Sequence, residues 1–298
     1  MTILLDEKSR VLVQGITGRE GIARTRFMLD YGTNVVAGVT PDRGGQKVHG
    51  VPVYDTVRIA SERHGVFDVS VTFVPGPLVK DAVLETIEAG VKLVVVPAER
   101  VPLHDALEML THAKNYGARI IGPGSIGLIS PGKAAVGWLG GTLEFAKEVF
   151  AMGHVGITSR SGSQSSTVAW IVKEAGLGVS TCVCTGSEPL VGTVHAELLE
   201  LFEKDAETDA VAMFGEIGSV AEEEAAELIA GGGFTKPLVA FIAGAWAREG
   251  MRFSHASAII EHGKGTAQSK VKALEEAGAY VVDRPEKIAL TLRRLLRS

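Results

Sequence analysis

The chain has 298 residues, of which 46% are hydrophobic and 22% charged, and its formal net charge at pH 7 is −5. These values predict a globular protein of about two domains. The chain has no Lys/Arg run interleaved with aromatic residues and no unbroken apolar stretch of about 18 residues, so neither nucleic acid nor membrane is an expected partner. The first residues lack a basic region followed by a long apolar core, which favours a cytoplasmic location.

The first half of the chain alternates short apolar strands with helical segments. The expected strands are 10–14, 34–39, 69–74, 93–96 and 119–121. The expected helices are 22–31, 78–89 and 103–116. Near-continuous apolar strands that alternate with helices predict a parallel sheet covered on both faces. The pattern therefore indicates an α/β, Rossmann-like domain over residues 1–123.

The second half repeats this alternation after a segment rich in Gly and Pro. Residues 124–153 show weak periodicity and are expected to form a linker and irregular chain. The expected strands that follow are 155–158, 179–183, 210–214, 238–242 and 280–282. The expected helices are 164–175, 195–204, 221–229, 267–277 and 285–296. We therefore expect a second doubly wound domain, of flavodoxin-like type, over residues 124–298.

Two loops of the first half have features of phosphate-binding sites. Residues 15–21 follow a strand and open a helix with the spacing Gly-x-x-Gly-x-x-Gly, which differs from the dinucleotide fingerprint Gly-x-Gly-x-x-Gly. Arg43 lies in a glycine-flanked turn at the end of the second expected strand, beside Asp42. The Arg favours an extra phosphate, as in NADP or coenzyme A (CoA), whereas the Asp weakens that signal and a plain tight turn is the alternative.

A third loop, residues 158–166, also follows a strand and begins a helix. Its small and hydroxyl residues would let several backbone N–H groups meet an anion, and Ser163 is the expected N-cap. The chain has neither a Gly-x-Ser-x-Gly nucleophile elbow nor a Walker A sequence. A nucleoside triphosphate would therefore have to be held by another element.

His255 is the strongest candidate for covalent chemistry. It lies between the small residues Ser254 and Ala256, and Glu216 lies just after another expected strand, 210–214. A carboxylate that binds one ring N–H leaves the other ring nitrogen as an attacking lone pair. The alternative is an ordinary surface or structural histidine.

Several other polar residues have simpler interpretations. The remaining histidines show no metal-binding spacing, so no metal site is expected. Cys182 and Cys184 alternate on one expected strand, where a disulfide is geometrically poor, and they are interpreted as free thiols. Residues 222–224 are three glutamates at a helix start, where acids complement the helix dipole.

Taken together, these loops resemble the α subunit of succinate–CoA ligases, also called succinyl-CoA synthetases. The similarity covers essentially the whole chain and keeps the order of the motifs. The matching segments are Val13-Gln14-Gly15-Ile16-Thr17-Gly18, Gly38-Val39-Thr40-Pro41 with Gly44-Gly45, Phe73-Val74-Pro75, Pro97-Ala98-Glu99, Ser159-Arg160-Ser161-Gly162, Gly215-Glu216-Ile217-Gly218, and His255-Ala256 followed by Ala258-Ile259-Ile260.

The resemblance implies a CoA-binding domain followed by a ligase domain, and it assigns roles to individual residues. His255 would carry a phosphoryl group and Glu216 would orient it. The implied phosphate-binding residues are Ser161, Gly162 and Ser163, and the acid substrate would lie near Ser166. The implied CoA contacts are Gly15, Thr17, Gly18, Arg19, Glu20, Pro41, Arg43, Val74, Pro75, Pro97, Ala98 and Glu99.

The resemblance also implies a partner and a reaction. An ATP-grasp β subunit would hold ATP or GTP with Mg²⁺, in an αβ or α2β2 assembly. A small carboxylic acid would be joined to CoA through acyl phosphate and phosphohistidine intermediates. For succinate, this reaction belongs to the tricarboxylic acid cycle.

Departures from the family pattern leave the acid open. The chain has Gly122-Pro123-Gly124-Ser125-Ile126-Gly127 for Gly-Pro-Asn-Cys-Pro-Gly, Ser166-Thr167 for Tyr-Glu, Ser187-Glu188-Pro189 for Gly-Asp-Pro, and Ser219 for Gly. Because Ser166 replaces a phenol with a small hydroxyl group, we expect succinate not to be the preferred substrate. Malate–CoA or citrate–CoA ligase small subunits, an inactive CoA-binding regulatory protein and an NADP-dependent oxidoreductase are the alternatives.

Overall fold

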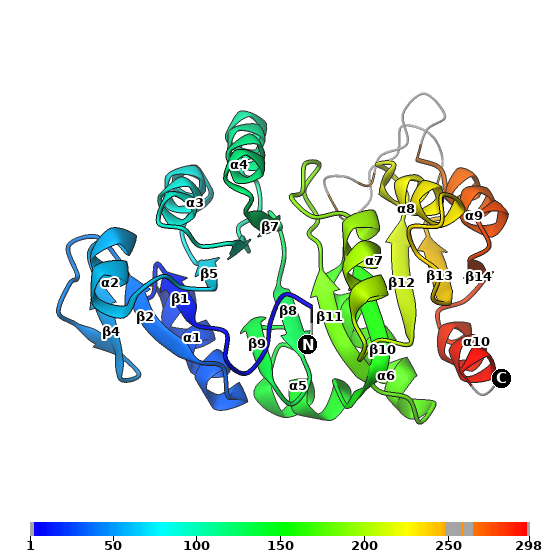
Figure 1. Cartoon of the computed structure of the whole chain (residues 1–298), viewed down its shortest axis with the longest axis horizontal. Coiled ribbons are helices and arrows are strands. Elements are labelled where there is room, and N and C mark those ends of the chain that lie inside the picture. The colour runs from blue at the N-terminus through cyan, green and yellow to red at the C-terminus, as the bar shows by residue number, and fades with distance from the viewer. Residues whose placement is uncertain (1–2, 248–254, 256–257, 259–264, 297–298) are drawn as a thin grey trace.

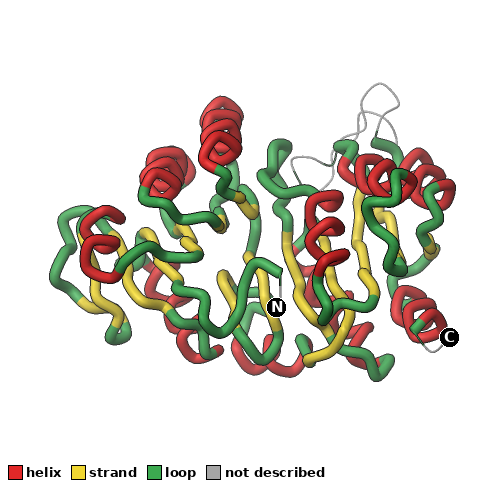
Figure 2. The backbone as a smooth tube through the Cα atoms, in the orientation of Figure 1, coloured by secondary structure: helices red, strands yellow, loops and turns green. Residues whose placement is uncertain are grey.

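The computed structural model describes residues 3–247, 255, 258 and 265–296. The chain folds into two seven-stranded sheets that lie side by side, with helices on both faces of each (Figures 1 and 2). In the part of the chain that the structure describes, no helix is long and apolar enough to cross a bilayer.

The first sheet has the strand order β3-β4-β2-β1-β5-β6-β7, and all neighbours are parallel except β3 and β4. Without the short strand β3, this is the Rossmann order 3-2-1-4-5-6. The strands are β1 (Val11–Gln14), β2 (Val35–Val39), β3 (Lys47–Val48), β4 (Val51–Tyr54), β5 (Val69–Thr72), β6 (Leu93–Val95) and β7 (Arg119–Ile121). The order confirms the predicted Rossmann-like fold of this half.

Helices α2, α3 and α4 cover one face of the first sheet (Figure 1). Helix α1 lies on the opposite face and contacts the second half of the chain through β9 and α5. The helices are α1 (Arg19–Tyr31), α2 (Val57–His64), α3 (Val79–Glu88) and α4 (Leu103–Tyr116), with a 3₁₀ turn, η1, over Gly76–Leu78. The predicted helices are therefore confirmed, whereas the prediction omitted the elements between β2 and β5 because that segment is polar and irregular in its spacing.

The second sheet has the order β14-β13-β12-β10-β11-β8-β9. Its parallel part, β14-β13-β12-β10-β11, is the flavodoxin-like order 2-1-3-4-5 read from the other edge. The strands are β8 (Gly127–Ser130), β9 (Ala134–Gly137), β10 (Met152–Ser159), β11 (Val179–Cys184), β12 (Ala210–Glu216), β13 (Leu238–Ala243) and β14 (Tyr280–Val282). The second doubly wound unit is therefore also confirmed.

Two helix layers enclose the second sheet: α7, α8 and α9 pack together on one face, and α5, α6 and α10 on the other (Figure 1). The helices are α5 (Leu143–Val149), α6 (Gly162–Glu174), α7 (His195–Lys204), α8 (Ala221–Ala230), α9 (Ala267–Glu276) and α10 (Lys287–Leu295). The predicted boundary between residues 123 and 124 lies between β7 and β8, and it stays a prediction.

The expected linker over residues 124–153 is wrong. This segment forms the antiparallel hairpin β8–β9, which extends the second sheet through β11, and then helix α5. The hairpin strands are only four residues each and are fully buried. Strands that are buried on both sides show no alternation of apolar and polar residues, and this is why periodicity missed them.

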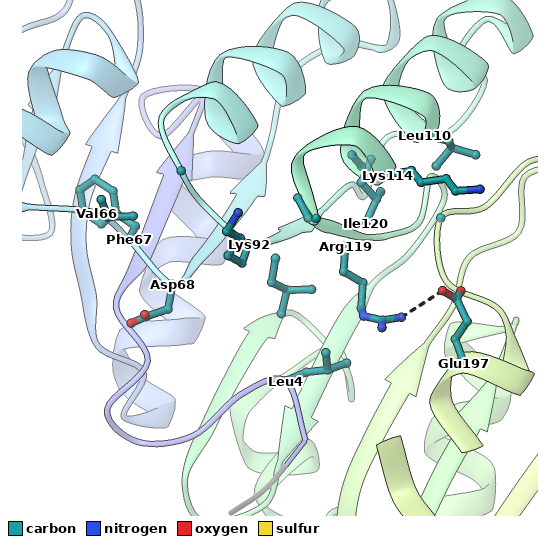
Figure 3. Close-up of a pocket in the computed structure, with 16 residues that line it drawn as sticks. Leu4, Val66, Phe67, Asp68, Lys92, Leu110, Lys114, Arg119, Ile120 and Glu197 are labelled. Atoms are coloured by element: carbon teal, nitrogen blue, oxygen red, sulfur yellow. Dashed lines mark hydrogen bonds and ion pairs between the residues drawn. The ribbon is translucent and has the colours of Figure 1, made fainter. Parts of the chain in front are cut away.

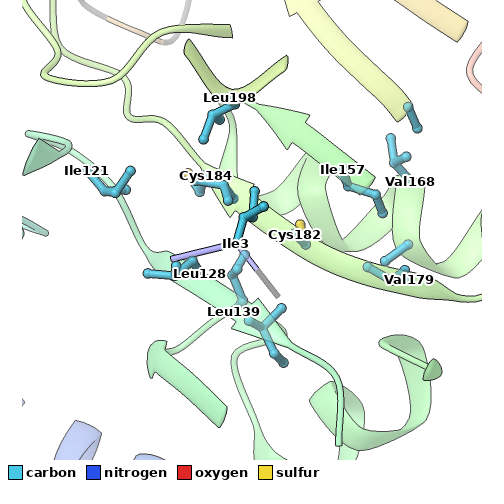
Figure 4. Close-up of a cluster of buried hydrophobic side chains, with 14 of the residues drawn as sticks. Ile3, Ile121, Leu128, Leu139, Ile157, Val168, Val179, Cys182, Cys184 and Leu198 are labelled. Carbon is cyan, nitrogen blue, oxygen red and sulfur yellow. The ribbon is translucent and has the colours of Figure 1, made fainter. Parts of the chain in front are cut away.

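The core of the second sheet continues to the N-terminal segment. Ile3 packs near Leu128, Leu139 and Cys182 in one buried cluster (Figure 4). Cys182 and Cys184 are both buried and free, as predicted, and burial raises the pKa of the Cys184 thiol. The thiols therefore act as small core residues and are not activated as nucleophiles.

Candidate active site

The candidate active site lies at the carboxyl ends of neighbouring parallel strands β10, β12 and β13. Glu216 is the last residue of β12, and its carboxylate oxygens lie 2.8 and 2.9 Å from Nδ1 of His255. A carboxylate can only accept, so Nδ1 carries the hydrogen and Nε2 keeps a lone pair. The side chain of His255 is 20% exposed and that of Glu216 is 13% exposed. Glu216 therefore orients the ring, and the ring stays accessible from the surface.

The rest of the predicted histidine loop lies mainly outside the described residues. The small neighbours Ser254 and Ala256, and the motif residues Ile259 and Ile260, belong to that part of the chain. Ala258 is described; it is buried, and its N–H donates to the carbonyl of His255 at 3.1 Å.

Arg160 supports this pair from the start of the α6 loop, and the sequence interpretation gave it no role. Its Nε lies 3.8 Å from a carboxylate oxygen of Glu216, and the residue is only 3% exposed. Its other contacts are to the carbonyls of Gly186 and Glu188, at 3.2 and 2.7 Å, and to the hydroxyl of Ser219 at 2.9 Å. A guanidinium held on three sides keeps a fixed positive charge beside the His–Glu pair.

A fully buried ion pair lies behind Glu216. One carboxylate oxygen of Glu222 accepts the backbone N–H of Glu216 at 3.0 Å, and the other pairs with Lys270. Burial raises the pKa of Glu222, but the surrounding charges and hydrogen bonds, chiefly those of Lys270, together outweigh burial, and the pKa lies below its usual value. The interpretation of residues 222–224 as helix-dipole acids was therefore incomplete.

His195 completes this buried layer. Its Nδ1 lies 2.8 Å from the hydroxyl of Thr158, and its Nε2 lies 3.8 Å from Glu222. Burial lowers the pKa of His195 to about 4, so the ring is neutral at pH 7. It therefore adds no charge to the site at that pH.

The serine-rich loop forms the N-terminus of α6, as expected, but the helix starts earlier than predicted. Its N-cap is Ser161, so the prediction of Ser163 as N-cap is wrong. The hydroxyls of Ser161 and Ser163 lie 3.2 Å apart, and Gly162 is the first helical residue. The first N–H groups of a helix have no intrahelical acceptor and attract anions. Ser166 is half-buried one turn further on.

The predicted CoA loops gather at the carboxyl edge of the first sheet. They follow β1, β2, β5 and β6, which are adjacent in the order β2-β1-β5-β6. In an open α/β sheet, ligands bind at this edge where the strand order reverses. The topology therefore brings these loops together, as the sequence alone could not show.

Gly15 shows how closely the loop after β1 approaches the loop after β5. Its φ is +71°, and a Cβ atom there would lie 2.3 Å from the carbonyl oxygen of Phe73. Only glycine fits this position.

Gly18 caps α1, and Thr17 donates its backbone N–H to the hydroxyl of Thr40 at 3.4 Å. Arg19 and Glu20 are exposed and pair with each other at 3.6 Å.

Arg43 lies in the turn after β2 and is exposed, as is Pro41. Within the described chain, Arg43 makes no ion pair with Asp42 or any other acid, so its charge is available to a ligand. Asp42 has a left-handed φ of +60°, and Gly44 donates its N–H to Asp55 at 2.8 Å. The acid beside Arg43 therefore shapes the turn and does not neutralise the arginine.

The two remaining loops face each other across neighbouring strands. Val74 and Pro75 follow β5, and Pro97, Ala98 and Glu99 follow β6. Val74 and Ala98 are half-buried, and both pack against the cluster under α3 and α4. Pro75 and Glu99 are exposed.

A pocket of about 840 Å³ lies elsewhere (Figure 3). Its lining includes Asp68, Lys92 and Arg119, which lie where β5, β6 and β7 begin. Arg119 pairs with Glu197 of α7 at 3.3 Å. This is the amino edge of the sheet, opposite the predicted CoA loops. The pocket is therefore a crevice between the two halves, separate from the candidate site.

The segments that depart from the family pattern meet in space. The hydroxyl of Ser125 donates to the carbonyl of Cys184 at 2.5 Å, and a Cβ on Gly162 would lie 2.3 Å from Ile126. Ser187 donates its hydroxyl to the carbonyl of Gly124 at 3.4 Å. These contacts place the altered loops around the N-terminus of α6.

One of the functional residues that the sequence interpretation missed carried a usable signal. Lys270 shares the buried stripe of α9 with Ala267 and Leu274, and a lysine in such a stripe indicates a buried acidic partner. Glu222 carried no comparable signal, because a glutamate in the first helical turn is ordinary.

Comparisons with known proteins identify the family of each half of the chain. A CoA binding domain model matches residues 6–100, and a CoA-ligase model matches residues 158–280. The chain is 47% identical over 99% of its length, and all of the relative's, to succinate–CoA ligase [ADP-forming] subunit alpha 2 of Archaeoglobus fulgidus. It is 44% identical over 99% of its length, and 98% of the relative's, to an ADP-forming sulfoacetate–CoA ligase subunit of an Acholeplasma species.

A solved structure shares the whole fold. ATP citrate lyase of Methanosaeta concilii, in complex with (3S)-citryl-CoA, matches 99% of this chain with a TM-score of 0.91 and 25% identity. This chain spans 51% of that lyase chain. The two domain models and the full-length relatives exclude the NADP-dependent oxidoreductase alternative, and the chain belongs to the succinate–CoA ligase α-subunit family of ADP-forming acid–CoA ligases.

Proposed function

We propose that the chain works with an ATP-grasp β subunit to join a short organic acid to CoA, with His255 as the phosphoryl carrier. The observation that carries this proposal is the pairing of His255 Nδ1 with Glu216 at 2.8 and 2.9 Å. It leaves Nε2 as the nucleophile. The β subunit would hold ATP or GTP with Mg²⁺, since the chain has no Walker A sequence.

In the proposed reaction, the Nε2 lone pair attacks the γ-phosphorus of the nucleotide, and the nucleoside diphosphate leaves. The phosphoryl group then passes to the acid carboxylate, which restores neutral His255 and gives an acyl phosphate. The CoA thiolate attacks the acyl carbon, and inorganic phosphate leaves. Arg160 and the first N–H groups of α6 would stabilise the charge of the transferring phosphoryl group.

The proposed CoA site is the carboxyl edge of the first sheet. The N-terminus of α1, whose first N–H groups have no intrahelical acceptor, suits the diphosphate. Arg43, which is exposed and makes no ion pair in the described residues, suits the 3′-phosphate. An inactive CoA-binding protein would have no use for an oriented histidine nucleophile. We place the enzyme in the cytoplasm.

The proposed acid carries more hydrogen-bond acceptors than succinate does. Succinate and sulfoacetate, which name the relatives above, are both short acids with a second anionic group. The α6 start presents Ser161, Ser163 and Ser166, whose hydroxyls can donate to a sulfonate or a hydroxy acid. A role in the tricarboxylic acid cycle would hold only for succinate.

The test is kcat/KM of the αβ complex for succinate, sulfoacetate, malate and citrate. We expect sulfoacetate or a hydroxy acid to exceed succinate, since a site that hydrogen-bonds a substrate group can discriminate by up to about 10⁴-fold. A clear preference for succinate would contradict the proposed acid and leave the reaction class intact. If the αβ complex forms no acyl-CoA from any of these acids in the presence of CoA and ATP, the proposed activity itself is contradicted.

A further inference from the structure

Glu188 connects the two halves of the molecule at the level of both candidate sites. It follows β11 in the second half and is 8% exposed. Its carboxylate accepts the backbone N–H of Arg100 at 2.8 Å, directly after the predicted CoA contacts 97–99. A buried carboxylate that receives a backbone N–H makes a charge-assisted hydrogen bond, which is among the stronger kinds in proteins.

The loop that receives this contact needs support. Arg100 has a left-handed φ of +57°, a conformation that costs free energy in any residue with a Cβ atom. Such strain persists only when surrounding contacts hold the backbone in place. The hydrogen bonds that the described second half makes to this loop come from the Glu188 carboxylate, which accepts, and from the N–H of Gly124, which donates to the carbonyl of Ala98 at 2.9 Å.

The opposite end of Glu188 belongs to the phosphohistidine site. Its backbone carbonyl accepts Nη2 of Arg160 at 2.7 Å, and Arg160 lies 3.8 Å from Glu216. The backbone of Glu188 therefore supports the histidine site, whereas its side chain supports the CoA loop. A side-chain substitution removes the second contact and keeps the first.

We propose that Glu188 is a positioning residue for CoA: from the ligase half, its carboxylate holds loop 97–100 of the other half in the conformation that binds CoA. This inference rests on the proposed function, because it requires CoA to bind at that loop. It predicts that the CoA-dependent step depends on the Glu188 side chain and that phosphorylation of His255 by ATP does not.

The experiment compares wild type with Glu188→Ala and Glu188→Gln in the αβ complex. We expect Glu188→Ala to raise the Kd and the KM for CoA on the order of 10-fold, as for the loss of one charge-assisted hydrogen bond. The rate of His255 phosphorylation by ATP without CoA should stay within about two-fold. Glu188→Gln keeps an acceptor oxygen and should recover most of the CoA affinity.

Glu197→Ala is the matched control. It removes another contact between the halves, the 3.3 Å pair with Arg119, at the opposite edge of the sheet. We expect it to leave the KM for CoA unchanged, which separates positioning of the loop from general attachment of the halves. If Glu188→Ala does not fold, Glu188→Asp serves: its shorter side chain should not reach Arg100, and the KM for CoA should rise.

Two results would overturn the inference: wild-type CoA affinity in both Glu188→Ala and Glu188→Asp, or a loss of His255 phosphorylation as large as the loss of CoA affinity. Failure of the wild-type complex to bind CoA in calorimetry would instead overturn the proposed CoA site. The two failures are therefore distinguishable.

Discussion

The carboxylate of Glu222 accepts the backbone N–H of Glu216 at 3.0 Å, so a buried ion pair fixes the end of the strand that presents the histidine partner. Neither Glu222 nor Lys270 has exposed side-chain surface. Two buried charges of opposite sign stabilise each other only as long as both are present. The geometry of the His255–Glu216 pair therefore depends on two buried residues outside the pair.

Removal of Lys270 should destabilise the fold strongly. In Lys270→Met, the carboxylate of Glu222 would lose its principal partner while it remains buried, which typically costs about 3–5 kcal/mol. The free energy of unfolding from urea titration measures this. The control is Lys272→Met, because Lys272 forms an exposed pair with Glu276 at 3.8 Å. It should lower the free energy of unfolding by less than about 0.5 kcal/mol. Equal effects of the two substitutions would show that the buried pair has no special role.

The buried, neutral His195 should make the fold sensitive to acid. Its pKa is about 4 in the folded protein, against about 6.5 for a free histidine. Between these values the unfolded chain binds a proton that the folded protein does not, so the free energy of unfolding falls as pH drops from about 6.5 to 4, by about 3 kcal/mol at most.

The pH dependence is measured by urea titration at several pH values. His195→Asn should flatten the curve over this range, because it removes the titrating ring. The carboxylates with lowered pKa values, such as Glu207 and Glu222, add their loss of stability as the pH falls toward and below 4.5, their ordinary value, so the range from about pH 6.5 to 5 isolates His195. A curve for His195→Asn that parallels wild type between pH 6.5 and 4 would assign the acid sensitivity to other groups.

Much of the architecture could be predicted because the parallel strands are apolar and regularly interrupted by amphipathic helices. The hairpin β8–β9 could not, since Gly127–Ser130 and Ala134–Gly137 are buried on both faces and carry no alternation. The pairing of His255 with Glu216 could be predicted from motifs. Arg160 and Glu188 were not, because their roles depend on contacts between segments distant in sequence.

Arg43 should discriminate between CoA and its dephosphorylated form. Arg43→Ala should weaken the binding of CoA about 10- to 100-fold, because a guanidinium–phosphate contact is a charge-assisted hydrogen bond. It should weaken the binding of dephospho-CoA far less. Calorimetry on the chain measures both affinities. Arg58→Ala is the control, since Arg58 is an exposed arginine of α2 that already pairs with Glu62 at 2.8 Å. Equal losses for both ligands would remove Arg43 from 3′-phosphate binding.

We expect His255 to carry a phosphoryl group while Glu216 orients it. Incubation with the β subunit, Mg²⁺ and γ-labelled ATP should give an acid-labile, base-stable label on wild type and none on His255→Asn. Glu216→Gln should fold normally and be labelled about 10- to 100-fold more slowly, the usual loss when a histidine loses its carboxylate partner. Labelling of His255→Asn to the wild-type level would contradict the account.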